Sequence, residues 1–175
     1  MEHISRIVLS AAVFLTVCTM GLFSENSPVP YGNKAAAQDT ELNIEDMLLY
    51  SLEDEYMAHA EYTAILAEFG TVKPFDSILK AEETHIAAVK RACGTHDIAV
   101  PPDQGAAYAV VPSDLKEALK TGVQAELDNI AMYERFLSDD KLAGADTSDI
   151  SRLFRSLKRA SENHLQAFRK QLKKY

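Results

Sequence analysis

Four segments of the chain have the pattern of amphipathic helices, and each carries an acid or a histidine in the middle of its apolar stripe. The segments cover about residues 42–70, 74–94, 113–137 and 147–172, with apolar residues recurring every three or four positions. The ionisable stripe positions are Glu55, Glu82, His85, Glu126 and His164. Isolated charges are very costly to bury. Five such groups on four helices therefore predict either a shared cation or a buried, hydrogen-bonded polar cluster.

The connections between the segments indicate an all-α fold. The first two segments are joined by a short turn, so we expect antiparallel neighbours. Between the second and third lie about 18 residues of weak helical signal, 95–112. Extended at about 3.3 Å per residue, this stretch can cross a helix of about 25 residues. We predict a four-helix bundle over residues 41–174 with a long crossover between its second and third helices.

A spacing within the second segment supports metal binding. Glu82 and His85 form Glu-x-x-His, which places both side chains on one helix face about a turn apart. Carboxylate and imidazole ligands suit iron or manganese, and the absence of thiolate ligands argues against a structural zinc site. We predict a site for one or two iron ions, with manganese as an alternative.

The chain also repeats itself. Glu55 and Glu126 are each followed seven residues later by a tyrosine, Tyr62 and Tyr133, which by themselves are typical core residues. Residues 81–89 align with residues 160–168, so that the two histidines coincide. Two half-bundles, each with Glu-x6-Tyr and a histidine helix, predict a site with pseudo-two-fold symmetry.

These motifs resemble those of the ferritin-like superfamily, in particular rubrerythrin-type proteins with Glu-x-x-Ala-x3-Tyr on the first helix. Residues 55–62 match that pattern, and residues 81–85 resemble the second-helix motif. The chain is most similar to a bacterial ferritin-like family known only as a domain of unknown function, whose last helix has a motif like residues 161–168. The resemblance implies a ferritin-like bundle with a di-iron-type site at Glu55, Glu82, His85, Glu126 and His164.

The sequence departs from that family pattern on the last helix. Ser161 stands where a complete site has its second bridging carboxylate, and Asn129 stands where rubrerythrins have another acid. Glu162 is adjacent but points away from the stripe on an ideal helix. The second metal position is therefore weak, completed by solvent or by Glu162, or absent.

The N-terminal region differs in composition from the rest. Residues 7–23 are an apolar run after Arg6, as in an export signal or a membrane anchor. We assign residues 1–23 to such a segment and residues 24–40 to a polar linker, in which residues 35–37 (Ala-Ala-Ala) fit a small-residue cleavage site. We expect export to the periplasm, the cell surface or the medium, with membrane contact only through this segment.

Charge and motifs narrow the function classes. The net charge of −8 argues against nucleic-acid binding. The resemblance implies a di-iron or di-manganese oxidoreductase of the ferroxidase or peroxide-scavenging type, with oxygen or peroxide as its partner. Two alternatives are a non-catalytic metal-binding bundle and a structural bundle with an incomplete site. A homodimer is compatible with all three functions. The sequence does not assign catalytic residues.

Overall fold

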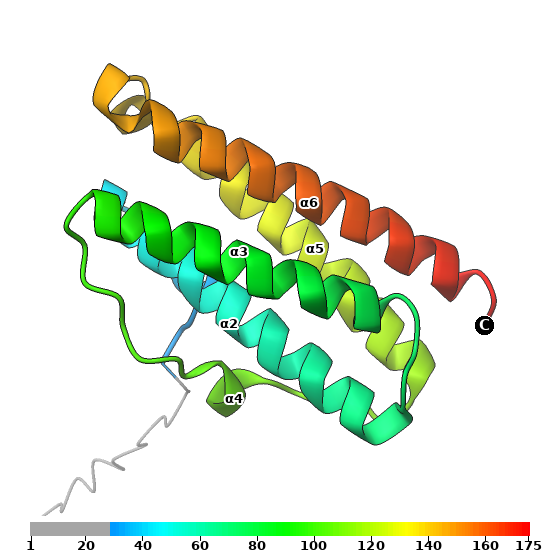
Figure 1. The fold of residues 1–175 in the computed structure, drawn as a ribbon. Coiled ribbons are helices and arrows are strands. Elements are labelled where there is room, and N and C mark those ends of the chain that lie inside the picture. The colour runs from blue at the N-terminus through cyan, green and yellow to red at the C-terminus, as the bar shows by residue number, and fades with distance from the viewer. Residues whose placement is uncertain (1–28) are drawn as a thin grey trace, which may run out of the picture.

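The computed structural model describes residues 29–175, and within this range all regular secondary structure is helical, as the sequence predicts (Figure 1). Four long helices dominate: α2 (Ile44–Phe69), α3 (Phe75–Thr95), α5 (Leu115–Leu137) and α6 (Ser148–Leu172). The shorter elements are α1 (Asn33–Gln38), α4 (Gly105–Tyr108), and the 3-10 turns η1 (Asp140–Leu142) and η2 (Ala145–Thr147).

The helix ends follow from local side-chain chemistry. Helix α2 begins with a capping box in which Asn43 and Asp46 exchange side-chain to backbone hydrogen bonds, and it ends at Gly70 as predicted. In the third long helix, predicted over about residues 113–137, the N-cap lies one residue after the start of that range. Asp114 is the N-cap, because its carboxylate accepts the backbone N–H of Glu117 at 2.9 Å.

The long helices form two antiparallel pairs, α2 with α3 and α5 with α6 (Figure 1). The segment between α3 and α5 returns along α2, so α3 and α5 run in the same direction. Its short helix α4 packs closely on α2: a Cβ at Gly105 would lie 2.2 Å from the carbonyl oxygen of Tyr56. The predicted long crossover is therefore present, and glycine allows its close approach.

Two apolar clusters fill the interior on either side of a polar layer. The first cluster contains Leu52, Tyr56, Tyr133, Phe136 and Phe154 among others, and the second contains Tyr62, Ile65, Phe75, Leu119 and Phe168. The buried polar residues in and around the layer include Ser51, Asp54, Glu55, Glu82, Glu126, Asn129 and Ser161. The interrupted stripes predicted from the sequence are thus buried rather than turned to solvent.

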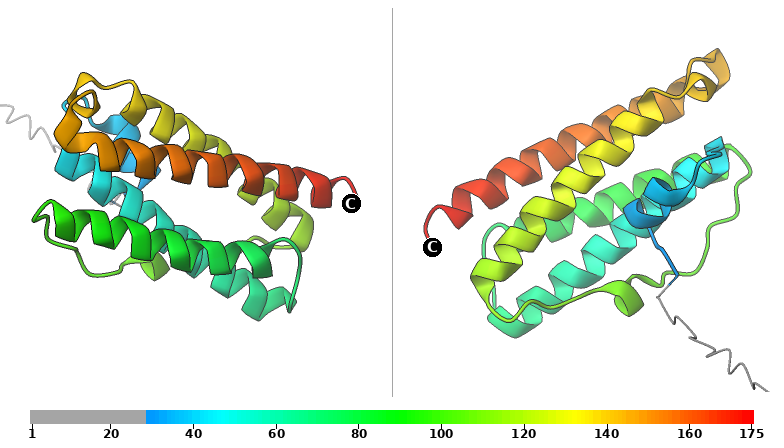
Figure 2. Two further views of the ribbon diagram at one scale, coloured as in Figure 1. Left: turned by 45° about the horizontal axis from the view of Figure 1, so that its top comes forward. Right: turned by 180° about the vertical axis from the view of Figure 1, so that it is seen from behind.

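Helix α1 changes the interpretation of the predicted linker. Residues 33–38 are helical, and Ala36 is only 1% exposed because α1 packs on α2 and α5 (Figure 2). Residues 35–37, the expected cleavage site, lie inside this helix. Six residues are too few for a helical period to be recognised, and the stabilising contacts come from distant parts of the chain.

Those contacts include hydrogen bonds to α2 and α5. The backbone N–H of Gly32 donates to Glu53 Oε2, and that of Asn33 donates to Asp54 Oδ1, both at 3.0 Å. From the other side, the guanidinium of Arg135 donates to the carbonyl oxygens of Ala36 and Asp39. The segment around α1 is therefore a packed part of the domain.

We expect Arg135→Ala to destabilise the domain by about 2–4 kcal/mol, since it removes two charge-assisted hydrogen bonds worth about 1.5–3 kcal/mol each, less some compensation by water. Urea unfolding followed by circular dichroism measures this change. Arg155→Ala, on the exposed face of α6, is the matched control and should change the free energy of unfolding by less than about 0.5 kcal/mol. Equal effects in the two variants would contradict the role assigned to Arg135.

The expected export segment, residues 1–23, lies outside the described residues. Within residues 29–175, no helix has the length and apolar character needed to cross a membrane.

Candidate metal centre

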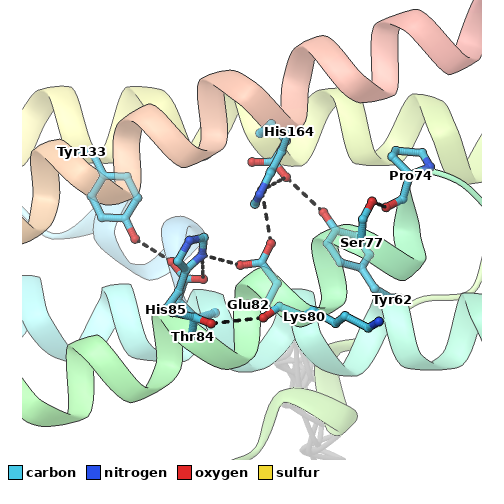
Figure 3. Close-up of polar contacts among 11 residues, drawn as sticks. Tyr62, Pro74, Ser77, Lys80, Glu82, Thr84, His85, Tyr133 and His164 are labelled. Atoms are coloured by element: carbon cyan, nitrogen blue, oxygen red, sulfur yellow. Dashed lines mark hydrogen bonds and ion pairs between the residues drawn. The ribbon is translucent and has the colours of Figure 1, made fainter.

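The five predicted site residues converge in the polar layer at the middle of the helices, and Figure 3 labels three of them, Glu82, His85 and His164. They form two groups whose possible ligand atoms lie within 4.8 Å of one another. The first group is Glu55, Glu82 and His85, and the second is Glu82, Glu126 and His164. Each of the four long helices contributes, and Glu82 belongs to both groups.

Glu82 lies between the two histidines. Its Oε2 is 2.8 Å from His85 Nδ1, and its Oε1 is 3.3 Å from His164 Nδ1 (Figure 3). The outer carboxylates complete the arrangement, with Glu55 Oε2 at 3.2 Å from His85 Nδ1 and Glu126 Oε1 at 3.4 Å from His164 Nδ1. The site is thus nearly symmetric, with one carboxylate in the middle and one carboxylate and one histidine on each side.

The histidines are held as cations in this arrangement. Burial by itself would lower the pKa of His85, but hydrogen bonds to Glu55 and Glu82 outweigh it and raise that pKa to about 10. Burial likewise opposes protonation of His164, and Glu126 and Glu82 raise its pKa to about 9. Two protons thus occupy positions between oxygen and nitrogen atoms that are the usual ligands of a divalent cation.

The three carboxyl groups respond differently to burial. Burial raises the pKa of Glu55, assisted by the negative charge of Glu82, and burial raises the pKa of Glu126. Burial also disfavours ionisation of Glu82, yet hydrogen bonds from His164 and His85 hold its pKa well below the usual range. Of the three carboxyl groups, that of Glu82 is therefore the one most strongly held in its ionised form.

Two tyrosines connect the halves crosswise. The Tyr133 hydroxyl of α5 donates to Glu55 Oε1 of α2 at 3.0 Å, and the Tyr62 hydroxyl of α2 donates to Glu126 Oε1 of α5 at 3.3 Å. Both tyrosines are fully buried, and burial raises their pKa well above the usual value. In each Glu-x6-Tyr repeat, the tyrosine therefore orients the outer carboxylate of the other repeat and not that of its own.

Several neighbouring residues are not ligands in this geometry. Glu162 is about half exposed and lies 3.5 Å from Lys158, away from the site. Ser161 is 6% exposed, on the buried face of α6. Glu162 is therefore paired with Lys158 in this geometry rather than with the five predicted site residues.

A buried carboxylate that the sequence reasoning missed lies beside the centre. Asp54 is 2% exposed, and burial raises its pKa to about 7 despite hydrogen bonds from the Asn33 backbone and the Asn129 side chain. The Asn129 Oδ1 atom is buried with no hydrogen-bond partner in the described part of the chain. Asp54 directly precedes Glu55, so it also attaches α1 to the turn of α2 that carries the site.

The histidine edge is the more accessible side of the centre. The side chains of His85 and His164 are 17% and 12% exposed, whereas those of the three carboxylates are 4–5% exposed. These histidines come from α3 and α6, which face each other across the site. The part of the centre most exposed to solvent is therefore the histidine edge between α3 and α6.

Comparison with known proteins identifies the family but not an activity. The sequence profile of an uncharacterized protein domain, DUF2202, matches residues 44–175. The chain belongs to this DUF2202 family. The match begins at the first residue of α2, so it includes all four long helices and the five site residues. The predicted similarity to a family of unknown function is thereby confirmed.

A solved structure extends the comparison of this DUF2202 chain to its fold. The crystal structure of a hypothetical protein, MJ0754 from Methanococcus jannaschii, superposes with a TM-score of 0.65 at 23% sequence identity. The match covers 79% of this chain and 84% of that one. At this identity the likeness concerns the fold alone. No curated protein matches the chain.

Proposed function

We propose that this chain is a ferritin-like metalloprotein with two adjacent metal positions, and that it acts on oxygen or peroxide as a di-iron, or di-manganese, oxidoreductase. The observation that carries the proposal is the position of Glu82, which belongs to both Glu/His groups. Carboxylate-bridged di-metal bundles take one glutamate from each of two helices and a Glu-x-x-His pair from each of the other two, and this centre has all of these ligands except the glutamate that Ser161 replaces.

The residues present fit such a pair of ions. Their ligand atoms are carboxylate oxygen and imidazole nitrogen, the ligands that iron and manganese accept. The three carboxylates are buried and the two histidines are partly buried, and the ligand atoms of each group lie within 4.8 Å of one another. Tyr62 and Tyr133 hold the outer carboxylates from behind, as hydrogen-bonded neighbours of metal ligands commonly do. The long crossover and the two antiparallel helix pairs further support a ferritin-like bundle.

Each residue has a distinct role in this proposal. Glu82 would bridge the two ions, Glu55 and His85 would hold one of them, and Glu126 and His164 would hold the other. The ions would supply the electrons for reduction of the oxidant. Since the histidine edge is the accessible side, the oxidant would approach between α3 and α6, and the buried tyrosine side would exclude water.

We also propose export, from the sequence of residues 7–23 alone, which would place this chemistry outside the cytoplasmic membrane.

Metal stoichiometry tests the proposal. We expect anaerobic titration of the metal-free chain with Fe(II) or Mn(II), followed by calorimetry and elemental analysis, to give about two ions per chain. Stopped-flow absorbance after mixing the ferrous protein with peroxide or oxygen should then show oxidation within seconds. One ion per chain and no oxidation would instead support the non-catalytic metal-binding alternative. The absence of any bound ion, with unchanged thermal stability on metal addition, would reject both.

A further inference from the structure

The two histidine helices offer different side chains at matching positions. Residues 81–85 and 160–164 align so that His85 pairs with His164, and Glu82 then pairs with Ser161. In the structure the two imidazole rings lie 5.7 Å apart, and both Glu82 and Ser161 are buried, at 4% and 6% exposed. A bridging carboxylate thus stands on one side of the pseudo-two-fold axis, and a hydroxymethyl group stands on the other.

The missing glutamate at position 161 affects the charge balance of the metal-loaded site. With both imidazoles neutral, Glu55, Glu82 and Glu126 supply three negative charges, whereas two divalent cations bring four positive ones. One positive charge is left over in a buried, low-dielectric layer, where an uncompensated charge is costly. The loaded site therefore lacks one anionic ligand, and Ser161 occupies the position from which the symmetric glutamate would provide it.

The difference in length between serine and glutamate indicates which group the missing ligand has to supply. A serine side chain stops at the γ atom, whereas a glutamate carries its carboxylate carbon at the δ position. Within the described residues, the nearest acid in sequence on α6, Glu162, is half exposed and paired with Lys158, so it does not take this place. The accessible histidine edge gives a small solute a route to the same side.

We propose that the metal-loaded site binds one small oxyanion, of the carboxylate or phosphate class, at the position that Ser161 leaves open beside the two metal positions. This inference rests on the proposed di-metal function. It assigns Ser161 the role of admitting an exogenous anionic ligand where a second glutamate would exclude it.

The test compares anion binding in the full chain and in Ser161 variants. After loading with two equivalents of Mn(II), calorimetric titration with acetate and separately with phosphate should show saturable binding of one anion per chain. The metal-free chain should show none. Tighter binding of one of the two anions identifies the class. Ser161→Glu should bind two Mn(II) ions but weaken anion binding at least tenfold, since its own carboxylate occupies the position. Ser161→Ala, with an equally short side chain, is the matched control and should retain anion binding.

The outcomes separate this inference from the proposed function. Two bound ions without acetate or phosphate binding would overturn the inference, with water or hydroxide as the remaining ligand, and would leave the proposed function intact. Equal anion affinity in wild type and Ser161→Glu would also overturn it. No metal binding would overturn both. Should Ser161→Glu fail to fold, as judged by circular dichroism, Ser161→Asp provides the same comparison with a shorter carboxylate.

Discussion

Glu82→Gln is expected to abolish metal binding at both positions of the site at once. Glu82 is the only residue shared by the two Glu/His groups among the described residues, and its two oxygens face different histidines. The amide keeps the shape of the side chain but loses the negative charge of the group whose pKa is held lowest. Loss of hydrogen-bonded neighbours of a ligand commonly costs 10–100-fold in metal affinity, so loss of the bridging ligand should exceed about a hundredfold for each ion.

The neighbouring acid provides the control for this variant. Glu83 is next in the chain, but its side chain is 63% exposed and its carboxylate lies 3.9 Å from His59, outside the site. Glu83→Gln removes the same charge from the protein and should retain two ions with unchanged affinity. A Glu82→Gln protein that still binds two ions would reject the bridging role. Retention of one ion would indicate that the two groups bind independently.

Glu82→Gln also has an effect on the metal-free protein. It leaves the imidazoliums of His85 and His164 without their shared partner, and breaking a buried ion pair commonly costs about 3–5 kcal/mol. Thermal unfolding in the presence of a chelator measures this effect separately from metal affinity, so a folded variant without metal binding remains interpretable.

The five site residues could be predicted from the sequence because ionisable side chains are unusual on the apolar stripe of an amphipathic helix. Glu55, Glu126 and His164 lie on apolar stripes, and such positions are tolerated only when the charges meet a partner. The stripe phase, the Glu-x-x-His spacing and the internal repeat together located the five residues without any three-dimensional information. The structure adds that Glu82 is central, which the sequence could not determine because it depends on how the two helix pairs face each other.

The features that the sequence did not reveal depend on contacts between distant segments. Helix α1 has no period of its own, and its position depends on Asp54 and Arg135, which lie 21 and about 100 residues away along the chain. Asp54 was not recognised as buried because it lies beside the stripe residue Glu55, and its hydrogen-bond partners, Asn33 of α1 and Asn129 of α5, are distant in sequence. Local patterns determine the long helices, whereas these buried polar partners require the assembled fold.

Metal binding is expected to release at least two protons and to strengthen steeply with pH. The pKa values of His85 and His164 are about 10 and 9 in the metal-free protein, so both rings are protonated near neutral pH. Each must lose its proton before its nitrogen can bind a metal ion. Between about pH 6 and pH 8.5, the overall constant for binding two ions should therefore rise about a hundredfold per pH unit.

Calorimetry in two non-coordinating buffers with different ionisation enthalpies measures the released protons directly. His96→Gln is the matched control: His96 is also paired with an acid, at 2.9 Å from Asp149, but lies outside the centre. This variant should release the same number of protons as the wild type. His85→Gln should release about one proton fewer. Release of less than one proton by the wild type would mean that the histidines are not ligands.

The same protons act on the stability of the metal-free fold in the opposite sense. The pKa values of His85 and His164 are raised on folding from the ordinary value of 6.5, so their contribution is fully present below about pH 6.5. It is lost as the pH rises through about 9 to 10, where the folded protein loses these protons. Alkaline pH thus weakens the metal-free domain while it strengthens metal binding. The increase in melting temperature on metal addition should therefore grow from about pH 6 to pH 9 in wild type and be absent in Glu82→Gln.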